Sequence, residues 1–182
     1  MEKNFYDIVI FGSGLSAKAM SLVTRNAGLS FKIIADKNFG NNTNDDTRSL
    51  ALSVASKKML QVLGAEIKTE AVKKMVVIEG GLGNEKIKSR LTFDRELVNE
   101  DIAYIAEHSV IEKSLDKALK LKDSEFTRDE VIDIQKESNY TKITFKNKKS
   151  FLCGTVIFTE LLNPELQKIY NVKYNFFEYG QT

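Results

Sequence analysis

The sequence predicts an α/β fold, and three observations near its N-terminus support this. An apolar run at residues 7–11 is typical of a buried parallel strand. Two glycines, Gly12 and Gly14, interrupt the run, and a stretch with helical periodicity follows at about residues 15–27. Strand, glycine turn and helix in this order are what a Rossmann-like, dinucleotide-binding βαβ unit requires.

The small residues of the motif Gly12-Ser13-Gly14-Leu15-Ser16-Ala17 have distinct expected roles. Gly12 allows a tight turn out of the strand, and Gly14 lets the backbone approach a pyrophosphate at the N–H groups of the helix. Ala17 permits close packing of the helix on the strand. The alternative is an ordinary turn of an α/β domain without a ligand, and the strand and helix on either side favour the nucleotide site.

The rest of the chain adds further helices and strands, so we expect an α/β domain with inserted β structure. In the first helix, Leu15, Ala19, Leu22 and Val23 are expected to form the buried face. The other expected elements are a strand at 30–35, a helix at 53–63, strands at 74–79 and 88–93, a helix opened by a capping box at Ser109 and Glu112, strands at 131–136, 140–145 and 151–158 with a hairpin turn at 146–149, and a short helix at 163–170.

Composition excludes several classes of function. The 182 residues carry a net charge of only +2 without a basic stripe, so nucleic acid is not an expected partner. Cys153 and His108 are the only residues of their kinds, which argues against disulfides, a metal site and a Ser-His-Asp triad. Cys153 lies in an apolar run and is expected to be buried. No apolar stretch approaches the roughly 18 residues that span a bilayer, so we expect a cytoplasmic protein.

Two charged residues are candidates for contacts with a nucleotide. Asp36 follows the second expected strand, close to where a carboxylate holds the ribose hydroxyls, and the alternative is a solvated turn residue. Arg48, in Asp46-Thr47-Arg48, has the donors to reach a phosphate or a flavin edge. For Arg48 the residues alone favour the alternative, a solvated pair of loop charges.

Several segments in order resemble the flavin-dependent aromatic hydroxylases, and within them the ubiquinone-biosynthesis group of the 2-polyprenyl-6-methoxyphenol hydroxylase type. These segments are the glycine motif, Asp46-Thr47-Arg48-Ser49-Leu50-Ala51-Leu52-Ser53, Ile102-Ala103-Tyr104-Ile105-Ala106-Glu107-His108 and Tyr179-Gly180-Gln181-Thr182. The resemblance covers essentially the whole chain, but only about the first half of a family-sized protein.

The resemblance implies a para-hydroxybenzoate-hydroxylase-like fold that binds FAD, truncated in this chain. NAD(P)H would be the co-substrate, and a polyprenylated phenol the small-molecule substrate that is hydroxylated with oxygen. Gly12, Gly14 and Ala17 would then hold the FAD pyrophosphate, Asp36 the adenosine ribose, and Arg48 another part of the cofactor. No catalytic residue is assigned, and any membrane contact would be peripheral, at the inner membrane.

The sequence also departs from that family. Ser109 stands where an arginine or glutamine usually contacts FAD, and residues 158–162 lack the Asp-Gly of the second flavin motif. The third motif, gly-asp-ala-ala-his, is absent. We therefore expect residues 1–182 to form a single incomplete FAD-binding domain, with the βαβ unit and its next helix at 1–64 and the remainder at 65–182.

Because of these departures, other possibilities stay open. The chain is either half of a hydroxylase, completed by a companion chain or a second copy, or a non-catalytic remnant with weak or no FAD binding. An NAD-linked dehydrogenase built on the same βαβ unit is a third possibility, weakened because no second half of the sheet with a plausible catalytic pair follows.

Overall fold

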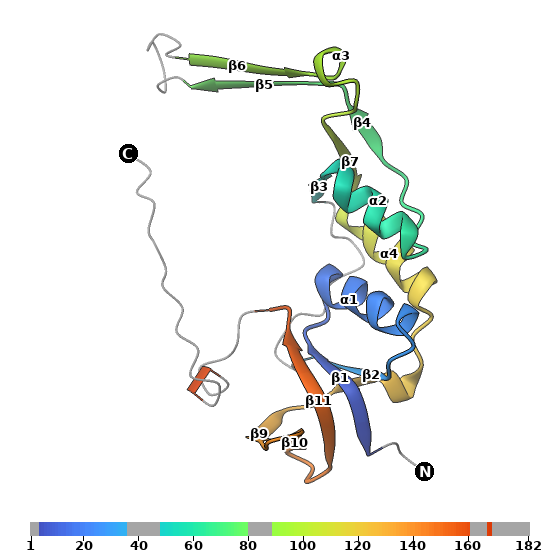
Figure 1. Cartoon of the computed structure of the whole chain (residues 1–182), viewed down its shortest axis with the longest axis vertical. Coiled ribbons are helices and arrows are strands. Elements are labelled where there is room, and N and C mark those ends of the chain that lie inside the picture. The colour runs from blue at the N-terminus through green and yellow to red at the C-terminus, as the bar shows by residue number, and fades with distance from the viewer. Residues whose placement is uncertain (1–3, 36–47, 80–88, 161–166, 169–182) are drawn as a thin grey trace. The chain divides into compact units, whose positions relative to one another are not determined.

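The computed structural model describes residues 4–35, 48–79, 89–160 and 167–168. The chain divides into two compact units, Met1–Gly40 with Leu121–Thr182, and Asn41–Lys120 (Figure 1). Both contain helices and strands, and the first is built on a largely parallel sheet, so the predicted α/β class is confirmed. The short helix expected at 163–170 lies largely outside the described residues.

The first unit contains a six-stranded sheet in the order β8-β2-β1-β11-β10-β9. The strands β8, β2, β1 and β11 are parallel, and β10 and β9 continue the sheet as an antiparallel meander. In Figure 1 the blue strand β1 runs beside the orange strand β11. The elements are β1 (Phe5–Phe11), α1 (Leu15–Asn26), β2 (Phe31–Ala35), η1 (Asp123–Glu125), β8 (Phe126–Arg128), β9 (Val131–Lys136), β10 (Thr141–Phe145) and β11 (Ser150–Phe158).

Helix α1 connects β1 to β2 and contacts both strands. Its expected apolar face is wrong in part, because Val23 is 42% exposed while Ser21 and Thr24 are buried. The two hydroxyls donate to carbonyl groups one turn earlier, from Ser21 Oγ to Ala17 O (2.8 Å) and from Thr24 Oγ1 to Met20 O (2.9 Å). Since their hydrogen bonds are satisfied within the helix, these polar residues can occupy its buried side.

The second unit contains an antiparallel three-stranded sheet, β3-β7-β4, and a separate hairpin, β5–β6. Ser53 caps α2 by accepting from Ser56 N (3.0 Å), in agreement with the expected start of that helix. Helix α4 instead begins at His108, so the capping box expected at Ser109 is wrong. The elements are β3 (Ser49–Leu52), α2 (Val54–Val62), β4 (Glu70–Val72), β5 (Lys74–Glu79), β6 (Ser89–Asp94), α3 (Arg95–Val98), β7 (Ala103–Glu107) and α4 (His108–Leu119).

None of the helices within the described ranges has the length and apolar character needed to cross a bilayer.

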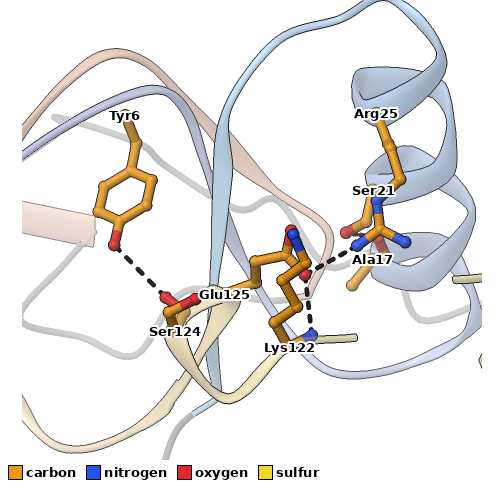
Figure 2. A network of polar contacts seen from close by, with 7 residues as sticks. All are labelled: Tyr6, Ala17, Ser21, Arg25, Lys122, Ser124 and Glu125. Atoms are coloured by element: carbon orange, nitrogen blue, oxygen red, sulfur yellow. Dashed lines mark hydrogen bonds and ion pairs between the residues drawn. The ribbon is translucent and has the colours of Figure 1, made fainter. Parts of the chain in front are cut away.

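A polar network joins α1 to the segment that leads into β8 (Figure 2). One carboxylate oxygen of Glu125 accepts from Arg25 Nη2 (2.8 Å) and from the backbone N–H of Lys122 (2.9 Å). The hydroxyl of Tyr6 on β1 donates to Ser124 O at 3.4 Å. The network therefore ties the crossover helix and the η1 turn to the central strands of the sheet.

Glu125→Gln is expected to lower the free energy of unfolding by about 1 kcal/mol, because a partly buried charge-assisted contact loses its charge. Glu130→Gln is the matched control: its pair with Lys146 has the same 2.8 Å length, but the side chains are 66% and 48% exposed, against 31% and 19% for Arg25 and Glu125. Urea denaturation measures the free energy of unfolding of both variants. Equal losses would contradict a larger contribution from the Arg25–Glu125 pair than from the Lys146–Glu130 pair.

Cys153 lies in the core of the first unit with no exposed surface, as expected. Burial raises the pKa of its thiol to about 11. The neutral thiol is therefore favoured in the folded chain, and its contribution to stability is lost as the pH rises from the range of a free thiol toward 11. We expect a water-soluble disulfide reagent to leave Cys153 unmodified at pH 8 and to label it rapidly in urea, as followed by absorbance. Rapid labelling of the folded chain would contradict this placement.

Candidate functional site

The candidate site lies at the carboxyl ends of β1 and β11. Phe11 is in register with Phe158 on one side and with Ile34 of β2 on the other, so these strands end together. The chain leaves β1 toward β2 on one side and returns as β11 on the other. In open α/β sheets, this reversal of direction at the carboxyl ends of the strands is where ligands bind.

The turn after β1 closes against the end of β11. The N–H and hydroxyl groups of Thr159 both donate to Phe11 O, at 3.0 and 2.9 Å, and the N–H of Gly12 donates to Ile34 O at 2.9 Å. Gly12 has a φ of +123°, and a Cβ there would lie 2.2 Å from Thr159 Oγ1. Both the backbone angle and the lack of space therefore require glycine at position 12.

The carboxylate of Glu160 lies on the N–H groups of the glycine turn. Its Oε1 accepts from Ser13 N at 2.9 Å and from Gly14 N at 3.3 Å. Gly14 is the N-cap of α1, and the first turn of that helix contains neither a side-chain cap nor an acidic residue. Glu160 thus supplies the negative charge that a helix N-terminus favours, although it lies 146 positions after Gly14 in the sequence.

The contacts of the glycine turn with Glu160 show which kind of group the turn can bind. The donors at Ser13 and Gly14 hold an anionic oxygen in the structure, and the carboxylate of Glu160 stands in for such a group. Among the described residues, a Cβ at Gly14 would meet only Glu160 Oε1, at 3.7 Å, which is an ordinary contact. The turn therefore has the donors and the helix N-terminus that a diphosphate requires.

The other predicted site residues lie at different distances from this turn along the chain. Ala17 is fully buried on α1, which packs against β1 and β2. Arg48 directly precedes β3 in the second unit, where its carbonyl accepts from His108 N at 2.8 Å. Asp36 lies outside the described residues, one position after β2 ends at Ala35. Gly12, Gly14 and Ala17 therefore share one strand–turn–helix unit, and the contacts of all five residues with a cofactor stay predictions.

Thr159 and Glu160 are not among the site residues that the sequence predicts. The expected Asp-Gly pair is missing from their segment at the end of the last strand. The structure shows that Glu160, an acid with one more methylene, reaches the glycine turn from this place. An acidic residue within two positions of the end of a parallel strand was the available signal.

A cavity of about 770 Å³ lies at the opposite, amino ends of the strands. Since β1 has seven residues, this cavity is about 20 Å from the glycine turn. Polar groups in its wall bind one another: Lys32 Nζ donates to Ser124 O at 3.0 Å, and Arg25 pairs with Glu125 (Figure 2). Its lining includes Asn4, Tyr6, Leu29, Lys32, Ser150 and Phe151. No residue predicted to act in the site belongs to it.

Solved structures with a similar fold include two monooxygenases and a hydroxylase. The chain is similar to p-nitrophenol 4-monooxygenase from Pseudomonas putida, with 12% identity, a TM-score of 0.69, and coverage of 95% of this chain and 45% of that one. It is also similar to a putative FAD-containing monooxygenase from Photorhabdus luminescens, with 12% identity, a TM-score of 0.62, and coverage of 91% and 42%. The chain shares their fold.

A third similar structure is 2,6-dihydroxypyridine-3-hydroxylase from Arthrobacter nicotinovorans, with 14% identity, a TM-score of 0.58, and coverage of 86% of this chain and 37% of that one. The chain thus spans less than half the length of each of these three structures. No protein-family model and no curated protein sequence matches it. The expected resemblance to the fold of flavin-dependent hydroxylases is therefore confirmed at the level of the fold.

The two glycines of the turn are expected to respond differently to alanine. Gly12→Ala should lower the free energy of unfolding by about 1–3 kcal/mol from backbone strain alone, and further from the clash with Thr159. Gly14→Ala should change it little, because Gly14 has a φ of −75° and the added Cβ makes an ordinary contact. Urea denaturation of both variants measures this, and similar losses would contradict the geometry of the turn.

Proposed function

We propose that this chain binds FAD through the glycine turn between β1 and α1 and serves as the FAD-binding part of a flavin-dependent monooxygenase. The observation that carries the proposal is the anionic oxygen held by the N–H groups of Ser13 and Gly14 at the N-terminus of α1. This turn lies where open α/β sheets bind nucleotides. The fold shared with flavoprotein oxygenases supports FAD as the nucleotide.

The chain's own residues would bind and orient the cofactor. Ser13 and Gly14 would donate backbone N–H groups to the diphosphate, and Gly12 keeps the turn narrow enough to present them. In the same proposal, Asp36 holds the adenosine ribose and Arg48 contacts another part of FAD, as the sequence resemblance implies. When bound, FAD supplies the electron transfer and oxygen chemistry of the reaction.

The finer part of the proposal concerns the substrates. We propose NAD(P)H as the reductant and a polyprenylated phenol as the molecule that is hydroxylated, on the sequence resemblance to the ubiquinone-biosynthesis group. We further propose that the protein is cytoplasmic. The polyprenyl tail of this substrate would bring the protein into peripheral contact with the inner membrane. The chain spans less than half of the similar structures, so we propose this activity for a whole monooxygenase of which the chain forms the FAD-binding part.

A titration of the 182-residue chain with FAD, followed by flavin fluorescence and calorimetry, tests the proposed site. We expect saturable binding that Gly14→Val weakens at least tenfold, because its side chain fills the space that the diphosphate would occupy. Thermal unfolding of the same variant is the control, and the titration is made well below its unfolding midpoint so that lost binding reports on the site. The absence of binding at millimolar FAD would overturn the proposal.

If FAD binds, the same samples report on the chemistry. Oxidation of NAD(P)H that is stimulated by a polyprenylated phenol, with a product one oxygen atom heavier by mass spectrometry, supports a monooxygenase. FAD binding without such a product confines the proposal to cofactor binding.

A further inference from the structure

The glycine turn already binds a carboxylate, and this has a consequence for any phosphate that binds there. Glu160 Oε1 accepts from both Ser13 N and Gly14 N. Each backbone N–H presents a single hydrogen, so an oxygen of a diphosphate at the same donors would have to replace the carboxylate or share them with it. Two anions at one helix N-terminus also repel each other.

We propose that Glu160 acts as an internal competitor for the glycine turn and lowers its affinity for the diphosphate of a nucleotide. This inference rests on the proposed function, because it concerns the same turn. In the free chain the carboxylate satisfies the donors of the turn. When a diphosphate binds, the Glu160 side chain leaves Ser13 and Gly14, and the nucleotide takes its place.

The two residues that precede Glu160 can remain in position during this exchange. Thr159 is held to Phe11 O by both its N–H and its hydroxyl group. Phe158 is paired in register with Phe11, and their rings stack at 4.9 Å between centroids. The backbone therefore stays anchored to the end of β1 while rotation about side-chain bonds withdraws the carboxylate. Gly12 gives the Glu160 side chain room beside the turn, because a Cβ at position 12 would lie 3.1 Å from Glu160 Cγ and Cδ.

The carboxylate also determines selectivity between ligands. A neutral ligand could share the turn with Glu160, whereas an anion must overcome its charge. Removing the charge should therefore favour ADP and FAD over adenosine, which lacks phosphates. An effect on ADP and FAD but not on adenosine distinguishes competition at the turn from a change in the structure of the whole first unit.

Calorimetric titration of the 182-residue chain with ADP and with FAD tests the proposal. Glu160→Gln keeps the length of the side chain and an acceptor oxygen but removes the charge, so we expect roughly three- to tenfold tighter binding of both ligands. The matched control is Glu137→Gln, which removes the same charge from an exposed position between β9 and β10 and should leave affinity unchanged. The difference in affinity between Glu160→Gln and the unaltered chain should become smaller at high salt, because salt screens the charge of Glu160.

Equal or weaker binding by Glu160→Gln, with measurable binding by the unaltered chain, would overturn the competition and leave the proposed function intact. Weaker binding would instead make Glu160 a residue that holds the turn in the conformation that binds the ligand. If neither the unaltered chain nor Glu160→Gln binds FAD or ADP, the proposed cofactor site itself fails.

Amide resonances of Ser13 and Gly14 provide a second readout that does not depend on the variant's stability. Saturating ADP should move both signals in the unaltered chain, because phosphate replaces carboxylate as their acceptor. If Glu160→Gln folds, the two ADP-bound spectra should agree at these amides. Bound ADP that leaves both signals unmoved would overturn the competition.

Discussion

The close approach between the ends of β1 and β11 is the constraint on which the candidate site depends. Phe11 O accepts two hydrogen bonds from Thr159, and the strand register brings Phe11 opposite Phe158. This contact leaves no room for a side chain at Gly12. It also places Glu160 beside the turn. The tight turn, the glycine within it and the acid next to it thus share one cause.

The N-terminus of α1 is capped by a residue that lies far from it along the chain. Unpaired N–H groups at a helix N-terminus are costly when they are shielded from water. Gly14 has no side chain that could cap them, and a larger residue would restrict access to the turn. In this chain Glu160 supplies the cap instead. The same donors therefore stabilise the fold here, and under the proposed competition they would also bind a phosphate, with an affinity that Glu160 lowers.

Local sequence patterns predicted the long elements well and the short ones poorly. The strands at 74–79 and 131–136 were expected at those bounds, and Gly28 and Gly64 end their helices with positive φ, as glycines at these positions usually do. Strands β3, β4 and β8 have three or four residues each, and no strand was expected there. Segments of this length carry too little periodicity, and only their partner strands make them strands.

By itself, the sequence determined the βαβ unit and the need for glycine in its turn, because strand, turn and helix are encoded by adjacent residues. Only the tertiary structure decided that Glu160 lies on that turn, across a separation of 147 residues from Ser13. Pairing of β1 with β11 brings the two together, and no local pattern specifies which strand is adjacent or where it ends. The physical reason is that register arises from packing of the whole sheet, whereas backbone conformation in a turn is a property of the residues within it.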